Sequence, residues 1–186
     1  MSLAKSSPAL FGLLRRSFPA TAIALAEECF ALSLQLGGLE DSAVFRAEGV
    51  SFNPKPARLA LILLNETSFR ELELVCSAML MSVPLTNIQH CNTIKISTQH
   101  LTATWTLLDA PSLCSQIETN TSSLALALVW ALDHLRHIHM TTLSPLEIKA
   151  LADQLHSLAM LTAVPEVARL QQLLAHICNR ILSDPA

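Results

Sequence analysis

The stretch SSLALALVWALDHLRHIHMTTLSPLEIKALADQLHSLAML, residues 122–161, decides the fold class of this chain. Its apolar side chains recur at three- and four-residue spacings, which predicts a helix over residues 122–140 with one buried stripe. Ser144, Pro145 and Glu147 then form an S-P-x-E start, in which Ser144 caps a second helix, Pro145 suits its first position and Glu147 completes a capping box. Two long helices in succession indicate a helical domain.

The same periodicity continues on both sides of this stretch. It predicts helices over residues 20–36, 56–64 and 69–83, the last two as a packed antiparallel pair, and a final helix that begins near Pro165. Residues 86–121 predict only short helices and loops, because polar side chains interrupt every apolar run. The sequence therefore predicts an all-α domain of about six to eight helices. The residues expected on the buried stripes of the first, fourth and last long helices are Ile23, Ala24, Glu27, Phe30, Ala31 and Leu34; Leu124, Leu128, Ala131, Leu135 and Ile138; and Val167, Leu170, Leu173, Leu174, Ile177 and Ile181.

Length and composition narrow the class of protein. A chain of 186 residues suits one domain over residues 1–186 and is long enough to bury a core. Apolar residues make up 51% and charged residues 15%, which excludes wholesale disorder and favours a surface covered in part by a protein partner or by a second copy. The net charge of -3 and the absence of any basic run argue against nucleic acid as a partner.

Cysteine usage and hydropathy bear on the compartment. The five cysteines are widely spaced and form no CxxC pair, which favours reduced thiols in a cytoplasmic protein. The longest stretch without formal charge, residues 74–94, contains Pro84 and several amide side chains, so no membrane-spanning helix is expected. Arg15-Arg16 and the apolar run after it resemble a signal peptide, but Pro19 interrupts that run and the helical pattern continues beyond it.

Three blocks carry a resemblance to a known family. They are RAEGVSFNPKPARLALIL from Arg46, SAMLMSVPLTN from Ser77 and LADQLHSL from Leu151. In order and spacing they resemble the HD-domain phosphohydrolases, in particular the RelA/SpoT-type hydrolase domain of guanosine tetraphosphate metabolism and the small alarmone hydrolases. The resemblance spans residues 46–158 and implies a single HD-domain-like helical bundle.

The resemblance also argues against the family's chemistry. The positions that bind the divalent metal in those hydrolases fall on Lys55, Met81, Ser82 and Asp153, and of these only Asp153 keeps a metal-coordinating group. One carboxylate cannot hold a hard metal ion against water. The acidic pair that follows the His-Asp pair in the family falls on residues 85–86, which are Leu and Thr. The resemblance thus implies a catalytically inactive pseudo-hydrolase without a metal cofactor, acting as a regulatory or protein-interaction module.

The sequence is also compatible with two other functions. Arg46 matches the position that contacts a purine base in the family, so Arg46, Lys55 and Asp153 form a candidate site for a guanosine nucleotide that is bound without turnover. In that site Lys55 would pair with Asp153 in place of the metal. In an unrelated helical bundle, by contrast, Arg46 would be a loop charge and Asp153 a solvated helix residue.

The second alternative is an enzyme with a relocated metal. Asp133 and His137 lie four residues apart, so one helix face presents both of them to a metal ion. His134 and His139 are close in sequence, but neither is an obvious third ligand on that face. A polar helix end, where imidazole and Arg136 suit the negative end of the helix dipole, is the simpler interpretation.

Overall fold

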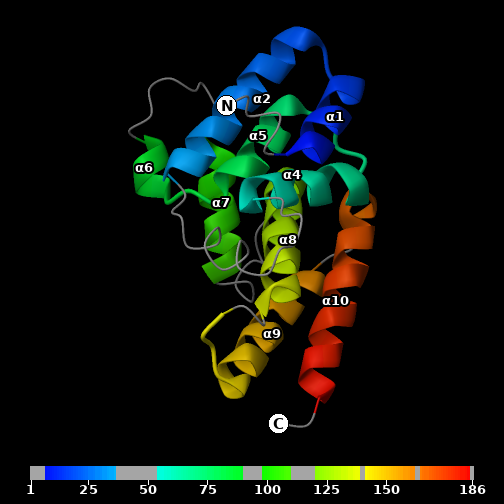
Figure 1. Ribbon diagram of the computed structural model, residues 1–186. Helices are drawn as coiled ribbons and strands as arrows, with labels where there is room; N and C mark the ends of the chain where they lie inside the picture. The colour runs from blue at the N-terminus through cyan, green and yellow to red at the C-terminus, as the bar shows by residue number, and fades with distance from the viewer. Residues whose placement is uncertain are drawn as a thin grey trace. The chain divides into compact units, whose positions relative to one another are not determined.

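The computed structural model describes residues 7–36, 54–89, 98–109, 120–138, 141–161 and 164–184. Within these ranges every regular element is a helix (Figure 1), so the predicted all-α class is confirmed. No helix in the same ranges is both long and apolar enough to cross a bilayer. The elements are, in chain order, α1 (Pro8–Ser17), α2 (Ala20–Leu36), α4 (Lys55–Glu66), α5 (Leu72–Leu80), α6 (Leu85–Gln89), α7 (Thr98–Asp109), α8 (Thr121–Arg136), α9 (Pro145–Ala159), the short 3-10 helix η4 (Pro165–Val167) and α10 (Ala168–Ser183).

The chain divides into two compact units. The first comprises Met1–Asn65 and Phe69–Thr98, and the second comprises Glu66–Ser68 and Gln99–Ala186. Each unit has helices that pack on one another. The expectation of one domain over residues 1–186 stays a prediction.

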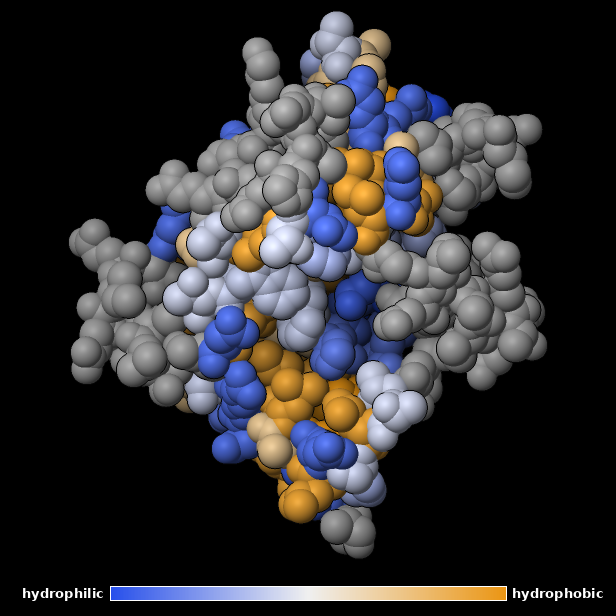
Figure 2. All heavy atoms as spheres, turned by 90° about the vertical axis from the view of Figure 1, so that its left-hand side faces the viewer, coloured by the Kyte–Doolittle hydropathy of each residue, from blue (hydrophilic) through white to orange (hydrophobic). Residues whose placement is uncertain are grey.

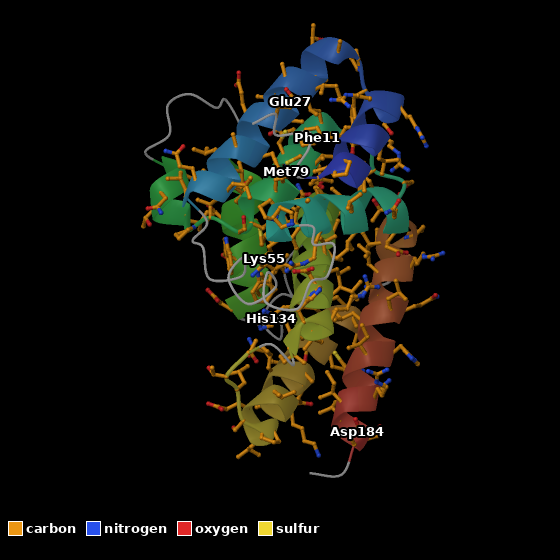
Figure 3. The ribbon with its side chains drawn as sticks, viewed as in Figure 1. Phe11, Glu27, Lys55, Met79, His134 and Asp184 are labelled. Atoms are coloured by element: carbon orange, nitrogen blue, oxygen red, sulfur yellow. The ribbon has the colours of Figure 1, made fainter. Side chains whose placement is uncertain are left out.

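The core of the first unit forms where α2 packs against α5 and α1. The carbonyl oxygen of Pro19 accepts hydrogen bonds from the backbone N–H groups of the first turn, which starts α2 where the sequence predicted. Phe11 of α1 meets Phe30 of α2 edge to face, with ring centroids 5.4 Å apart, and both rings are buried. Seven consecutive residues of α5, Leu74–Leu80, are buried as well, and Met79 lies among them (Figure 3).

The buried face of α2 is turned from the one expected. Ile23 and Phe30 are buried as predicted, but Ala24 is exposed. The core is lined instead by small residues of α2, namely Ala26, Cys29 and Ser33. The Ser33 hydroxyl donates to the carbonyl oxygen of Cys29 at 2.8 Å, which satisfies a polar group that would otherwise disfavour burial.

The second unit is built around α8, whose residues Ser123–Val129 are all buried. This helix packs against α10, α9 and η4. On another side it meets α7, where the Thr104 Oγ1 atom lies 3.3 Å from the carbonyl oxygen of Ser123. The side chain of Asn120 caps the first turn by accepting from the N–H of Ser122 at 2.8 Å. A helix that is apolar on nearly every side is typical of the centre of a bundle.

The predicted capping box of α9 is confirmed. The Ser144 hydroxyl oxygen accepts from the Glu147 N–H, while the Glu147 carboxylate accepts from the Ser144 N–H at 2.8 Å and from its hydroxyl at 2.6 Å. From this start α9 runs to Ala159 and packs extensively on α10.

The last helix starts through η4, which Pro165 opens, as expected. Leu170 and Leu174 lie on its buried face as predicted, and Val167 of η4 is buried beside them. Gln171 is also buried, and its side-chain amide donates to the carbonyl oxygen of Leu161 at 3.1 Å. The remaining members of the predicted stripe are half-buried: Leu173, Ile177 and Ile181.

Candidate functional site

Two of the predicted ligand positions lie at the end of α5. Met81 is 2% exposed and belongs to the core. The Ser82 hydroxyl donates to the carbonyl oxygen of Met79 at 3.0 Å. This bond satisfies one of the carbonyl groups that a helix end leaves without an intrahelical partner. Both side chains therefore complete a helix terminus and its packing.

The other predicted site residues are divided between the two units. Lys55 is half-buried in the first turn of α4, in the first unit (Figure 3). Asp153 is exposed on α9, in the second unit. Arg46 lies outside the described residues. A nucleotide site made of these three residues would draw on both units, and it stays a prediction.

Asp133 and His137 contact each other at the last turn of α8. Asp133 is 1% exposed, whereas His137 is partly open to solvent. The Nδ1 atom of His137 lies 2.8 Å from the carbonyl oxygen of Asp133 and 3.4 Å from its Oδ1. Because both oxygens only accept, we assign the proton to Nδ1, which leaves Nε2 as the acceptor of the neutral ring. The contact also helps to close the helix, since His137 is its C-cap residue.

His134 takes part in an aromatic cluster that the sequence analysis did not foresee. Its imidazole stacks on the Trp130 ring, with centroids 4.8 Å apart and planes 7° from parallel. Trp130 in turn meets the edge of Trp105 of α7 at 5.7 Å. The spacing of four residues between Trp130 and His134 was the available signal, because such pairs are neighbours on a helix surface. This cluster fastens α7 to α8 within the second unit.

The relocated metal site gains no further ligand in the described part of the chain. There, no group of three or more His, Cys, Asp or Glu side chains is placed to hold a metal ion. His134 is engaged with an indole ring, and His139 lies outside the described residues. The arrangement of Asp133 and His137 serves to orient one imidazole, and a metal bound there stays a prediction.

Buried thiols occur in both units. Cys29 and Cys76 come from the packed helices α2 and α5, and a hydrogen bond with Cys29, followed by burial, raises the pKa of Cys76 far above its ordinary value. Burial also raises the pKa of Cys178 on α10 to about 11. Because the thiolate is the reactive form of cysteine, neither shift favours a nucleophile at neutral pH.

Helix α9 exposes two large apolar side chains that the sequence did not predict. Leu146 and Met160 are 79% and 69% exposed, and they are the large apolar side chains most open to solvent among the described residues. Figure 2 shows apolar side chains at the surface in the lower part of the view, where the α9 region lies. We call the exposed residues along one side of this helix the outer face of α9: Leu146, Ala150, Asp153, Ser157 and Met160.

The fold and these groups define an all-α protein of two helical units, with two large apolar side chains, Leu146 and Met160, exposed on α9 in the second unit. Comparison of the chain with protein-family models, with curated proteins and with solved structures gives no match.

Proposed function

We propose that this protein is a catalytically inactive, HD-domain-like protein that acts as a regulatory or protein-interaction module. The proposal rests on the roles of Met81 and Ser82. These residues stand at two positions where the hydrolases that this chain resembles bind metal. Met81 fills the core and the Ser82 hydroxyl satisfies the end of α5. A thioether is a soft donor and a neutral hydroxyl a weak one, so neither suits the hard divalent metals that activate water in phosphate hydrolysis.

The exposed apolar residues support the interaction half of the proposal. Leu146 and Met160 are costly to leave in water on a chain with only 15% charged residues. The two side chains lie on the same side of α9, about 20 Å apart along its axis, and exposed apolar side chains on one helix face favour binding of another protein. A protein that binds a partner and catalyses no reaction accounts both for the roles of Met81 and Ser82 and for the exposed apolar side chains.

The catalytic half is tested by assaying the purified chain with guanosine tetraphosphate and Mn²⁺. We expect no release of pyrophosphate above the blank. Metal-dependent release that stops on chelation would overturn the proposal. If His137→Gln abolished that release while helix content by circular dichroism stayed the same, the relocated metal site would be supported instead.

The interaction half is tested by comparing native mass in two settings. We expect the chain in a native extract, or the purified chain by light scattering, to show a mass well above the 20.2 kDa of one copy. A single-copy mass in both settings would overturn the proposal. A thermal shift with guanosine tetraphosphate that Lys55→Ala removes would favour the nucleotide-binding alternative.

A further inference from the structure

The outer face of α9 has a regular spacing. Leu146, Asp153 and Met160 recur every seven residues, and Ala150 and Ser157 lie between them at steps of four and three. Seven residues are close to two helical turns, so these side chains share one face and successive members of the seven-residue series lie about 10 Å apart along the axis. Met160 is the C-cap residue of α9, so the face runs the full length of the helix.

The sizes of these side chains suit a second helix. Ala150 and Ser157 are small, so a partner's backbone can come close to α9 between its two ends. Leu146 and Met160 project at the ends and offer apolar surface to a partner. The steps of four and three are those of the d and a positions of a heptad, through which helices pack side by side.

Asp153 decides which partner fits. It is exposed at the centre of the face, and no ion pair among the described residues includes it. Covering a carboxylate with an apolar partner is costly unless a cation meets it. In a second copy paired about the centre of this face, parallel or antiparallel, Asp153 would lie opposite the other Asp153. Like charges at a covered contact disfavour that pairing.

We propose that the outer face of α9 binds an amphipathic helix of another protein, which places a Lys or Arg opposite Asp153 between two apolar residues, each seven positions away from it. The cation neutralises Asp153, and the apolar residues cover Leu146 and Met160. The inference rests on the proposed function as an interaction module, and it specifies the surface and the chemistry of the partner.

The test uses a fluorescein-labelled, hydrocarbon-stapled helical peptide that carries a Leu-x6-Lys-x6-Leu stripe, titrated with the full chain and followed by anisotropy. We expect saturable binding that weakens by about tenfold or more when the central Lys of the peptide becomes Glu. Asp153→Lys should reverse the preference between the two peptides. Leu146→Glu should weaken both, and Gln172→Lys, at an exposed position of α10, should change neither.

Three results would overturn the proposal. They are equal binding of both peptides by the unaltered chain, a preference that Asp153→Lys does not reverse, and a dimer by light scattering that Leu146→Glu dissolves. The last would make a second copy the occupant of this face. These failures are distinguishable from failure of the proposed function, because a large native mass would still indicate an interaction module that binds through another surface.

Discussion

Glu147 completes the capping box of α9. Its hydrogen bonds with Ser144 make the stability of the protein depend on pH. Bonds from the Ser144 hydroxyl, and then from the Ser144 N–H, lower the pKa of the Glu147 carboxyl below its ordinary value of about 4.5. The contribution of Glu147 to stability is therefore complete above pH 4.5 and is lost as the pH falls through the lowered pKa. We expect Ser144→Ala to raise this pKa toward the ordinary value in an NMR titration of the carboxyl carbon.

Ser157→Ala is the matched control for that experiment. Ser157 is an exposed serine of the same helix, far from the cap, so the variant should leave the pKa of Glu147 unchanged. If the two variants gave the same pKa, the capping bonds would not be the cause of the shift.

The buried thiol of Cys178 on α10 should react slowly in the native chain. Because Cys178 is fully buried and burial raises the pKa of its thiol to about 11, its alkylation by iodoacetamide at pH 8 should be much slower in the native chain than in urea. In urea the thiol should return to a pKa of about 8.5, and the rate should level off near pH 9. Mass spectrometry of the peptide that contains Cys178 measures both rates. A native rate at pH 8 close to the rate in urea would contradict the prediction.

The sequence predicted that Asp133 and His137 lie on one helix face, but it did not predict that Asp133 is buried. Their spacing of four residues was enough to place both side chains on one helix face. That Asp133 is 1% exposed was not predictable, because burial of that face depends on which helices pack against α8. Local spacing fixes which side chains meet within a helix, and only the tertiary fold fixes which are covered.

The central position of α8 predicts that two leucines contribute very differently to the free energy of unfolding. Leu128 is fully buried in α8, whereas Leu146 is 79% exposed on α9. We expect Leu128→Ala to lower the free energy of unfolding by about 2–5 kcal/mol, since it leaves a cavity. Leu146→Ala should change it by no more than about 0.5 kcal/mol. Urea denaturation followed by tryptophan fluorescence measures both variants, and equal effects would contradict the burial described for α8.

The contrast between α2 and α7 shows why one helix was predictable and the other was not. The start of α2 follows from Pro19, a local signal that any helical sequence can be searched for. Threonines such as Thr104 and Thr106 obscured α7, because β-branched side chains favour strands as much as helices. In the structure their hydroxyls donate to carbonyl oxygens four residues earlier, at 2.6 Å from Thr104 and 3.1 Å from Thr106. These bonds let threonine sit within a helix at little cost.

The tryptophans provide a probe of the second unit alone. The chain has two, Trp105 and Trp130, and both belong to the second unit. Phe30 lies in the core of the first, where Phe30→Ala should cost about 3–5 kcal/mol. Because each unit has its own packed helices, we expect this variant to move the urea transition seen by far-ultraviolet circular dichroism more than the one seen by tryptophan fluorescence.

Leu128→Ala is the control for that comparison, since its residue lies in the same unit as both tryptophans. It should move the fluorescence transition. Equal shifts in both signals for Phe30→Ala would show that the chain unfolds as one cooperative domain, as the sequence analysis expected.

The all-α class followed from the sequence because helical periodicity recurs along most of the chain. The division into two units did not, because no Gly- or Pro-rich linker marks it. The chain passes between the units on either side of Glu66–Ser68, at the end of α4, and again at Thr98–Gln99, in the first turn of α7. Glu66 already belongs to the second unit and pairs with Arg169. Because the boundary between the units lies at helix ends and not in a linker, the amino-acid composition does not change there.

The burial of α8 has a consequence for synthesis on the ribosome. Several elements that pack on α8, namely α9, η4 and α10, follow it in the chain. The nascent chain therefore holds α8, most of whose side chains are buried in the complete fold, without those neighbours until α10 has been made, whereas α1, α2 and α5 of the first unit are complete much earlier. Domains generally fold as units in the order in which they are translated. The second unit is therefore the one in which a stalled or truncated chain would expose an uncovered core to chaperones and proteases.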